Sequence, residues 1–355
     1  MLIEGIFAAI TTPFYPDERV YFRKLEANVA RYSRSLLAGM VVLGSTGESA
    51  TLDDDETRDV LRTVADAAAP EKVLIAGVGR ESAKSTVELA ETAAQFQFDA
   101  VLVRTPTYYA PHMTLEVVVN YFRSVADRSP LPVLLYNIPK FVPYQIPIEI
   151  VGELAQHPNI VGIKDSTGSM ERIKALIGAT ADAPRRTVAV TPIFEAVTKR
   201  MLRPAPSGSD ASSFVSLTEL AGGAAGVATA TPAQTSVKTR SREVGFQVLT
   251  GSASTVLDSI EAGAAGAILG FAACAPQACQ EVYFAWKDHD LKLAREKQER
   301  IDLPGKRIGG ELGISGIKYA CDFNGYYGGP PRLPLLSLSA QEKREVEVLL
   351  ADMRN

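Results

Sequence analysis

The sequence predicts a (β/α)8 (TIM) barrel with a C-terminal helical extension and a long insertion between strands 6 and 7. Short aliphatic runs alternate with segments of helical spacing along the chain. The runs are apolar on both faces, which is typical of parallel strands covered by helices. The first six runs begin at steps of roughly 30 residues, the length of one βα unit. Eight such units close a barrel of about 250 residues, and the chain has 355 residues.

The eight expected strands share short length and β-branched or aliphatic composition. They are residues 5–14, 39–47, 72–79, 100–106, 132–139, 160–166, 246–254 and 266–272. An open doubly wound sheet is the rival fold, and it would offer a glycine-rich dinucleotide loop after its first strand. The residues ITTPFYPDE at that place contain no glycine, so a closed barrel is favoured.

The barrel is expected to span residues 1–275, interrupted by the insertion, and residues 276–355 are expected to pack on it as helices. Helices are predicted in 281–302, 312–323 and 339–353.

The insertion is inferred from spacing. Lys164 and Gly251 are 87 positions apart, whereas one helix with its loops needs about 30 residues. The extra residues, 182–245, include the low-complexity stretches PAPSGSDASS and GGAAGVATATPAQTS. We expect this insertion to be mostly disordered. A lid, an oligomer contact or a gene-model artefact are the alternatives.

Charge and hydropathy exclude two classes of partner. The chain carries 37 Lys and Arg against 41 Asp and Glu, a net charge of -4, so it has no general basic field that would hold a nucleic acid. Its apolar runs are strand-length, far short of the ~20 residues of a membrane span. We therefore expect neither nucleic acid nor membrane as a partner.

Cysteine and histidine usage argues against disulfides and metal sites. The three cysteines and three histidines are Cys274, Cys279, Cys321, His112, His157 and His289. An odd number of cysteines without a CxxC pair indicates buried thiols in a reducing compartment. Because no targeting segment is visible either, a cytoplasmic location is expected. The histidines show no HxH or HExxH spacing, so no metal site is expected.

Lys164 is the most informative single residue. Alternation along strand 160–166 puts it on one face with Ile160 and Gly162. An ammonium inside a packed barrel is costly unless paired or neutralised, and desolvation lowers the pKa of a lysine, so its amine can become a nucleophile. The alternative is a charge that reaches solvent at the strand end. The interpretation of Lys164 as a nucleophile is favoured because active sites of such barrels lie at the C-terminal ends of the strands.

The GSTGE turn, residues 44–48, ends the second strand and precedes an acidic helix start at 53–56. Such a turn can direct backbone N–H groups and two hydroxyls at an anion, for example the carboxylate of a small keto acid. The alternative is a tight turn that caps the next helix.

Two tyrosines, Tyr108 and Tyr136, end strands four and five. A tyrosine in such a place is commonly a packed ring with its hydroxyl at the surface. Together with Thr46 and Lys164 on the same rim, however, the two phenols could relay a proton to a substrate hydroxyl.

These motifs resemble the dihydrodipicolinate synthase and N-acetylneuraminate lyase family of class I, Schiff-base aldolases. The resemblance covers nearly the whole chain except the insertion. One family signature is matched from Gly39 through GSTGE to Glu56, and a second by YNIP and GIKDSTG. The run GISGIKYACDFNGYYGGPPRLPLLSLS, residues 313–339, is similar to the 4-hydroxy-2-oxoglutarate aldolase branch and related 2-keto-3-deoxy sugar acid aldolases.

The resemblance implies roles for the site residues and requires neither a metal nor an organic cofactor. Lys164 would form an imine with pyruvate or another 2-keto acid, and Tyr136 would relay protons. Thr46 would link Tyr136 to Tyr108, which reaches into the neighbouring subunit's site, so a homodimer or homotetramer is expected. The residues expected to contact substrate are Ser45, Thr46, Gly47, Gly251 and Ser252.

One departure from the family pattern bears on the substrate. An arginine that clamps the carboxylate of aspartate semialdehyde usually lies two residues after the YNxP proline, and this position is Phe141 here. Lys140 adjoins it but would point elsewhere, and Val142 replaces a small hydroxyl residue. A ring cannot hold a carboxylate as a planar bidentate donor does.

The sequence therefore favours an aldolase that cleaves or forms a 4-hydroxy-2-keto acid, giving pyruvate and an aldehyde such as glyoxylate or a sugar-derived aldehyde. Dihydrodipicolinate synthase and a keto-deoxy sugar acid dehydratase are the alternatives within the family. A catalytically inactive barrel that binds a small acid, its reaction cycle spoiled by the insertion, is the alternative of another class.

Overall fold

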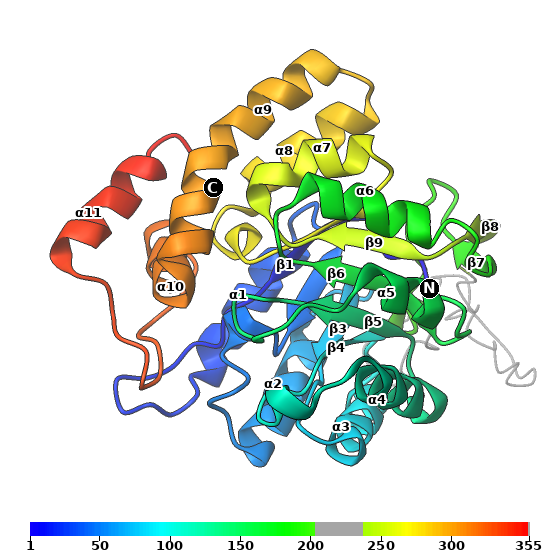
Figure 1. The fold of residues 1–355 in the computed structure, drawn as a ribbon. Coiled ribbons are helices and arrows are strands. Elements are labelled where there is room, and N and C mark those ends of the chain that lie inside the picture. Colours follow the sequence, from blue (N-terminus) through cyan, green and yellow to red (C-terminus); the bar gives the residue numbers. More distant parts are fainter. Residues whose placement is uncertain (203–236, 354–355) are drawn as a thin grey trace, which may run out of the picture.

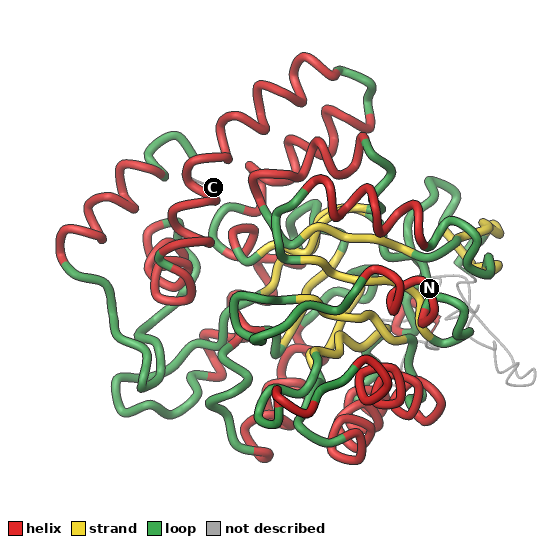
Figure 2. Tube along the Cα trace, in the orientation of Figure 1, coloured by secondary structure: helices red, strands yellow, loops and turns green. Residues whose placement is uncertain are grey.

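The computed structural model describes residues 1–202 and 237–353 and shows a closed barrel of parallel strands (Figures 1 and 2). The barrel strands follow the order β1-β10-β9-β6-β5-β4-β3-β2 around the ring. Their bounds are β1 Gly5–Ala9, β2 Gly39–Val42, β3 Val73–Gly77, β4 Ala100–Arg104, β5 Val133–Asn137, β6 Ile160–Asp165, β9 Gln247–Thr250 and β10 Gly266–Leu269. All eight expected strands are confirmed. Each ends earlier than predicted, because the last residues of each predicted range belong to the loops that form the mouth of the barrel.

Helices cover the outside of the barrel (Figure 1). They are α1 Phe22–Ser33, α2 Asp54–Ala67, α3 Ala83–Gln95, α4 Leu115–Arg128, α5 Ile148–Leu154, α6 Met170–Ala179, α7 Val256–Glu261 and α8 Pro276–Lys287. Helix α2 shows why such segments fold: Asp53 and Glu56 form a capping box at its start. Its apolar face, including Val60 and Val64, is buried, so local capping and burial favour the same element.

The core has two layers. Inside the ring lies a cluster drawn from the strands, including Phe7, Ile75 and Leu102. A second, larger cluster lies between the strands and the helices. Because the interior is filled with side chains, a substrate can enter only at an open end of the barrel.

The residues that share a face of β6 with Lys164 differ from those expected by simple alternation. Strand β6 carries an extra residue opposite the Val133/Leu134 step of β5, and such a bulge changes the face that side chains occupy. Ile160 consequently packs in the outer cluster. The prediction that Ile160 shares a face with Lys164 is therefore wrong. Lys164 pairs with Tyr136, a member of the interior cluster.

The C-terminal residues form a layer outside the barrel (Figure 1). It contains α9 Leu291–Pro304, a π-helical turn Gly305–Glu311, α10 Gly313–Phe323 and α11 Ala340–Leu349. The prediction of one helix over 281–302 is wrong, because α8 ends before α9 begins. His289 has a left-handed φ of 62°, which is typical of the end of a helix. The Asp290 side chain accepts the N–H of Leu293 and so caps the start of α9.

The described part of the insertion is ordered. Strands β7 Arg186–Val190 and β8 Arg240–Val244 form a two-stranded antiparallel sheet. The expectation of disorder is therefore wrong for residues 182–202 and 237–245, whereas residues 203–236 lie outside the described residues. The physical reason is that Val188 and Val190 alternate on one face and bury against Leu2.

This sheet lies at the N-terminal end of the barrel, opposite the mouth. Glu4, just before β1, pairs with Arg242 at 2.7 Å. The Arg200 guanidinium is buried and donates to the carbonyls of Ala68 and Lys72, just before β3. The alternative of a lid over the mouth is thus wrong for the described part of the insertion.

Candidate active site

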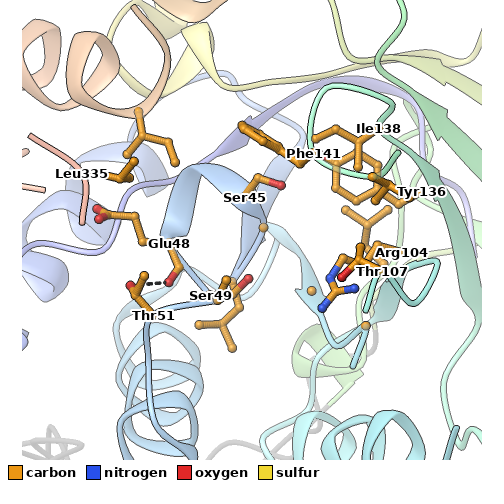
Figure 3. A pocket seen from close by; sticks show the side chains of 18 of the residues that line it. Ser45, Glu48, Ser49, Thr51, Arg104, Thr107, Tyr136, Ile138, Phe141 and Leu335 are labelled. Carbon is orange, nitrogen blue, oxygen red and sulfur yellow. Dashed lines mark hydrogen bonds between the residues drawn. The ribbon is translucent and has the colours of Figure 1, made fainter. Parts of the chain in front are cut away.

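Two adjoining cavities occupy the C-terminal mouth of the barrel. One, of about 280 Å³, contains Lys164 and is called the lysine cavity here. The other, of about 310 Å³, contains Arg104 and is called the arginine cavity (Figure 3). Their walls share Ser45, Tyr136, Ile138, Phe141 and Ile314. The two cavities are therefore neighbours that meet at shared side chains, Tyr136 and Phe141 among them.

Lys164 is held beside a phenol inside the mouth. Only 5% of its surface is exposed. Its Nζ donates to the Tyr136 hydroxyl at 3.3 Å. The two residues are register partners on β5 and β6, so the sheet itself sets their distance. A sheltered amine beside a proton donor and acceptor can act as a nucleophile toward a carbonyl.

The ends of β5 and β6 are fixed by a buried carboxylate next to Lys164. Asp165 accepts from Asn137 Nδ2 at 2.7 Å and from Arg172 Nε at 2.7 Å. Asn137 in turn accepts the N–H of Ile146. These bonds hold the two strand ends that carry Tyr136 and Lys164.

The GSTGE turn contributes two side chains to the lysine cavity. Ser45 and Thr46 line it, whereas Gly47 is buried and its carbonyl accepts the Thr12 hydroxyl at 2.7 Å. The turn does not cap α2, because Asp53 does so. The capping alternative for GSTGE is therefore wrong.

Glu48 ends this turn in a left-handed conformation with φ of 54°, which costs free energy for a non-glycine residue. A buried ion pair holds it there. Lys318 Nζ lies 2.5 Å from Glu48 Oε1 and also donates to the Thr12 carbonyl. Burial lowers the pKa of Lys318, and the attraction of Glu48 opposes that shift. The backbone N–H of Arg332 donates to the second carboxylate oxygen of Glu48 at 2.9 Å.

We expect Lys318→Met to lower the free energy of unfolding by about 3–5 kcal/mol, because it leaves Glu48 charged and buried without its partner. Urea unfolding followed by circular dichroism measures this change. The double variant Glu48→Gln/Lys318→Met should regain part of the loss. A double variant as unstable as the sum of the two single variants would contradict a direct ion-pair role.

The structure brings most of the sequence-predicted residues together, but Gly47 and Tyr108 line neither cavity. Gly251 and Ser252 line the lysine cavity with Lys164. A β-carbon added to Gly251 would lie 2.1 Å from Ser166 Oγ, so a larger residue does not fit. Tyr108 lines neither cavity and is 79% exposed. Within the described residues, no hydrogen bond joins the hydroxyls of Thr46, Tyr136 and Tyr108.

Residue 141 provides no charge at the mouth. Phe141 lines both cavities and is half exposed. The Lys140 ammonium next to it lines the lysine cavity and donates to the carbonyl of Gly310 in the C-terminal layer.

Several site residues were missed by sequence reasoning. Arg104 lines the arginine cavity, and Ile314 and Ile317 of α10 close the lysine cavity. Arg104 lies in one of the expected strands directly before TPTYY, so its charge at a strand end was the available signal. The isoleucines carry no local signal, because the C-terminal layer brings them to the mouth.

Among residues 1–202 and 237–353, no group of three or more His, Cys, Asp and Glu side chains could hold a metal ion. Within the same residues, no helix has the length and apolar character to cross a membrane. The three cysteines are buried, as predicted.

Comparison with known proteins gives a family match over most of the chain. The model of the dihydrodipicolinate synthetase family matches residues 2–184 and 214–353. The gap in this match lies within the insertion.

Among curated relatives, a 4-hydroxy-tetrahydrodipicolinate synthase of Methanothrix thermoacetophila is 27% identical over 352 residues, covering 99% of this chain and 97% of the relative. The enzyme of the same name from Acidiphilium cryptum is 28% identical over 352 residues and covers 99% of each chain.

Solved structures agree in fold. A dihydrodipicolinate synthase from Bacillus anthracis superposes with a TM-score of 0.77 at 23% identity, covering 100% of both chains. The chloride-inhibited synthase from Acinetobacter baumannii, complexed with pyruvate, gives a TM-score of 0.76 at 25% identity and covers 99% of each chain. The family model spans most of the sequence, and the barrel agrees with the fold of these solved structures. This chain therefore belongs to the dihydrodipicolinate synthetase family and is a class I carbon–carbon lyase.

Proposed function

We propose that this protein is a pyruvate-dependent synthase that joins pyruvate to aspartate semialdehyde through an imine on Lys164. The observation that carries the proposal is the buried Lys164 amine, 3.3 Å from the Tyr136 hydroxyl, in a cavity that Ser45 and Thr46 also line. The reported relatives are named for this synthase activity, and their names favour it over the keto acid cleavage that the sequence favoured.

The proposed chemistry starts with attack of the Lys164 amine on C2 of pyruvate and loss of water. The protonated imine nitrogen then accepts the electron pair left when C3 loses a proton, giving an enamine. C3 of the enamine attacks the aldehyde carbon, and the aldehyde oxygen takes up a proton. Tyr136 relays the protons, and Ser45 and Thr46 hold the pyruvate carboxylate. Attack by the product's own amine on C2 closes the ring and frees Lys164.

A second candidate is cleavage or formation of a 4-hydroxy-2-keto acid such as 4-hydroxy-2-oxoglutarate, by the same imine. Phe141 favours the 2-keto-3-deoxy sugar acids within this class, because their aldehyde part carries no carboxylate and a half-exposed ring at the mouth cannot bind one. Two parallel assays separate the candidates: condensation of pyruvate with aspartate semialdehyde, and pyruvate release from 4-hydroxy-2-oxoglutarate and 2-keto-3-deoxy sugar acids. Turnover of the keto acids alone would contradict the synthase proposal. A dehydratase would release no pyruvate, and an inactive barrel would form no imine.

Tyr108 completes the proposed proton relay only from a neighbouring copy of this chain, since its exposed ring lines neither cavity of its own subunit. We therefore expect a homodimer or homotetramer in solution, and light scattering on the active enzyme measures this. In an oligomer, Tyr108→Phe should lower kcat, by roughly 10-fold or more for a lost proton relay. A strictly monomeric protein with full activity contradicts this role. The buried cysteines suit a cytoplasmic location.

A further inference from the structure

Arg104 lies in the same row of the barrel mouth as the two central site residues. It is the register partner of Tyr136, which is in turn the partner of Lys164. Register partners on neighbouring parallel strands point to the same side of the sheet. Strands are about 4.8 Å apart, so the Cα atoms of Arg104 and Lys164 are about 10 Å apart with Tyr136 between them.

The largely apolar surroundings of Arg104 strengthen the effect of its positive charge in the arginine cavity. Arg104 and Thr107 lie on the side of this cavity where Tyr136 stands (Figure 3). Much of the remaining wall is apolar, from Leu43, Leu102, Ile138, Phe141, Val142, Pro334 and Leu335. Arg104 is the one cationic side chain among the described residues of the wall. An apolar wall strengthens the attraction between a guanidinium and an anion.

The backbone leaves room for this arginine. A β-carbon on Gly79 would lie 2.6 Å from Arg104 Cγ and 2.7 Å from its backbone nitrogen. Any residue larger than glycine at position 79, in the loop after β3, would therefore collide with Arg104. With its side chain 27% exposed, the guanidinium is partly shielded yet still open to the cavity.

Glu81 orients the guanidinium without using all of its donors. One Arg104 nitrogen lies 3.0 Å from Glu81 Oε1, and the other terminal nitrogen donates to the Thr105 carbonyl at 2.9 Å. Glu81 Oε2 accepts the backbone N–H groups of Thr107 and Tyr108. The negative charge of Glu81 therefore interacts both with Arg104 and with the loop that contains Thr107 and Tyr108. A guanidinium has five N–H donors, which leaves Arg104 able to bind a further anion.

We propose that Arg104 binds the carboxylate of the aldehyde that reacts with the pyruvate enamine, and so determines specificity for carboxylated aldehydes. This inference rests on the proposed function. An aldehyde joined to C3 of a Lys164-bound imine extends past Tyr136 toward the arginine cavity. The substrate class is then an aldehyde acid, such as aspartate semialdehyde or glyoxylate, and neutral sugar-derived aldehydes are poorer substrates. Planar bidentate binding by arginine suits a carboxylate.

Steady-state kinetics with saturating pyruvate test this assignment. Four proteins are compared: wild type, Arg104→Gln, Glu81→Gln and Arg123→Gln. The acceptors are aspartate semialdehyde and glyoxylate, which carry a carboxylate, and glycolaldehyde and glyceraldehyde, which are neutral. Arg123 is a matched control, because it pairs with Glu153 on the outer helices.

We expect the wild type to prefer the carboxylated aldehydes. Arg104→Gln should raise their KM by roughly 10- to 100-fold, as for loss of a charged hydrogen bond, while rates with neutral aldehydes stay within about twofold. Glu81→Gln loosens the loop that carries Tyr108, so it should lower kcat with all four aldehydes. Arg123→Gln should match the wild type.

Two results overturn the assignment. One is an equal loss by Arg104→Gln with charged and neutral aldehydes, which indicates a structural role. The other is a wild type that accepts only neutral aldehydes or none. Borohydride reduction with pyruvate, run in parallel on each protein, tests the imine of the proposed function independently of the role of Arg104. A covalent pyruvate adduct supports the imine whatever the kinetics with aldehydes, whereas its absence in the wild type refutes the function itself.

Discussion

Lys164→Ala is expected to abolish capture of pyruvate by borohydride and to lower kcat by about 10⁴-fold or more, because it removes the proposed covalent nucleophile. The amine is buried and has the Tyr136 hydroxyl as its hydrogen-bond partner, so its loss removes the amine that lies beside the proposed proton relay. Intact mass after reduction with pyruvate shows whether an adduct forms, and an assay of condensation gives kcat.

The matched control for this variant is Lys174→Ala, on the exposed side of α6. It removes an amine of the same kind from outside the barrel and should leave both adduct and rate unchanged. Circular dichroism establishes that Lys164→Ala is folded. A folded Lys164→Ala protein that still gains the pyruvate adduct would show that another lysine is the nucleophile.

Tyr136→Phe is expected to have the second largest effect, a fall in kcat of roughly 10²- to 10³-fold, as for the loss of a proton relay. The ring is part of the barrel interior and is retained in this variant, so the fold should persist. The hydroxyl that contacts the Lys164 amine is lost. Rapid-quench borohydride trapping should therefore show slow imine formation with an unchanged final adduct.

Tyr319→Phe is the matched control, because its hydroxyl binds Glu347 in the C-terminal layer, away from the mouth. This variant should keep the wild-type rate. If Tyr136→Phe forms the imine and turns over as fast as Tyr319→Phe, the phenol at 136 takes no part in proton transfer.

The parts of this fold that sequence reasoning predicted depend on local patterns. The barrel strands are short runs with a simple periodicity, and parallel strands of a barrel end at one rim. Residues at or just after the C-terminal ends of the strands, such as Ser45, Tyr136 and Lys164, therefore meet in one cavity. Their meeting follows from the fold class without any knowledge of side-chain contacts.

The parts that were missed depend on contacts between distant residues. The Glu48–Lys318 pair joins residues 270 positions apart, and neither local sequence identifies the other as its partner. The bulge in β6 arises from pairing with β5, which a single strand's alternation cannot indicate. For the same reason, the ordered sheet of the insertion was missed, since β7 and β8 are far apart in the chain.

The substrate illustrates a different limit. Phe141 indicated the loss of one carboxylate-binding residue, and the sequence argument inferred from it a different aldehyde. The structure shows Arg104 in the adjoining cavity, a cation that can serve a carboxylated aldehyde from another strand. A missing side chain at one position therefore does not establish the absence of its chemistry from the site.

The central claim is that the amine of Lys164 condenses with a 2-keto acid. Peptide mapping by tandem mass spectrometry of the wild-type enzyme, reduced with borohydride in the presence of pyruvate, tests it most directly. We predict one reduced pyruvate adduct per chain, located on the lysine of the IVGIKDS peptide. An adduct on any other lysine, or no adduct under conditions where the enzyme turns over, would contradict it.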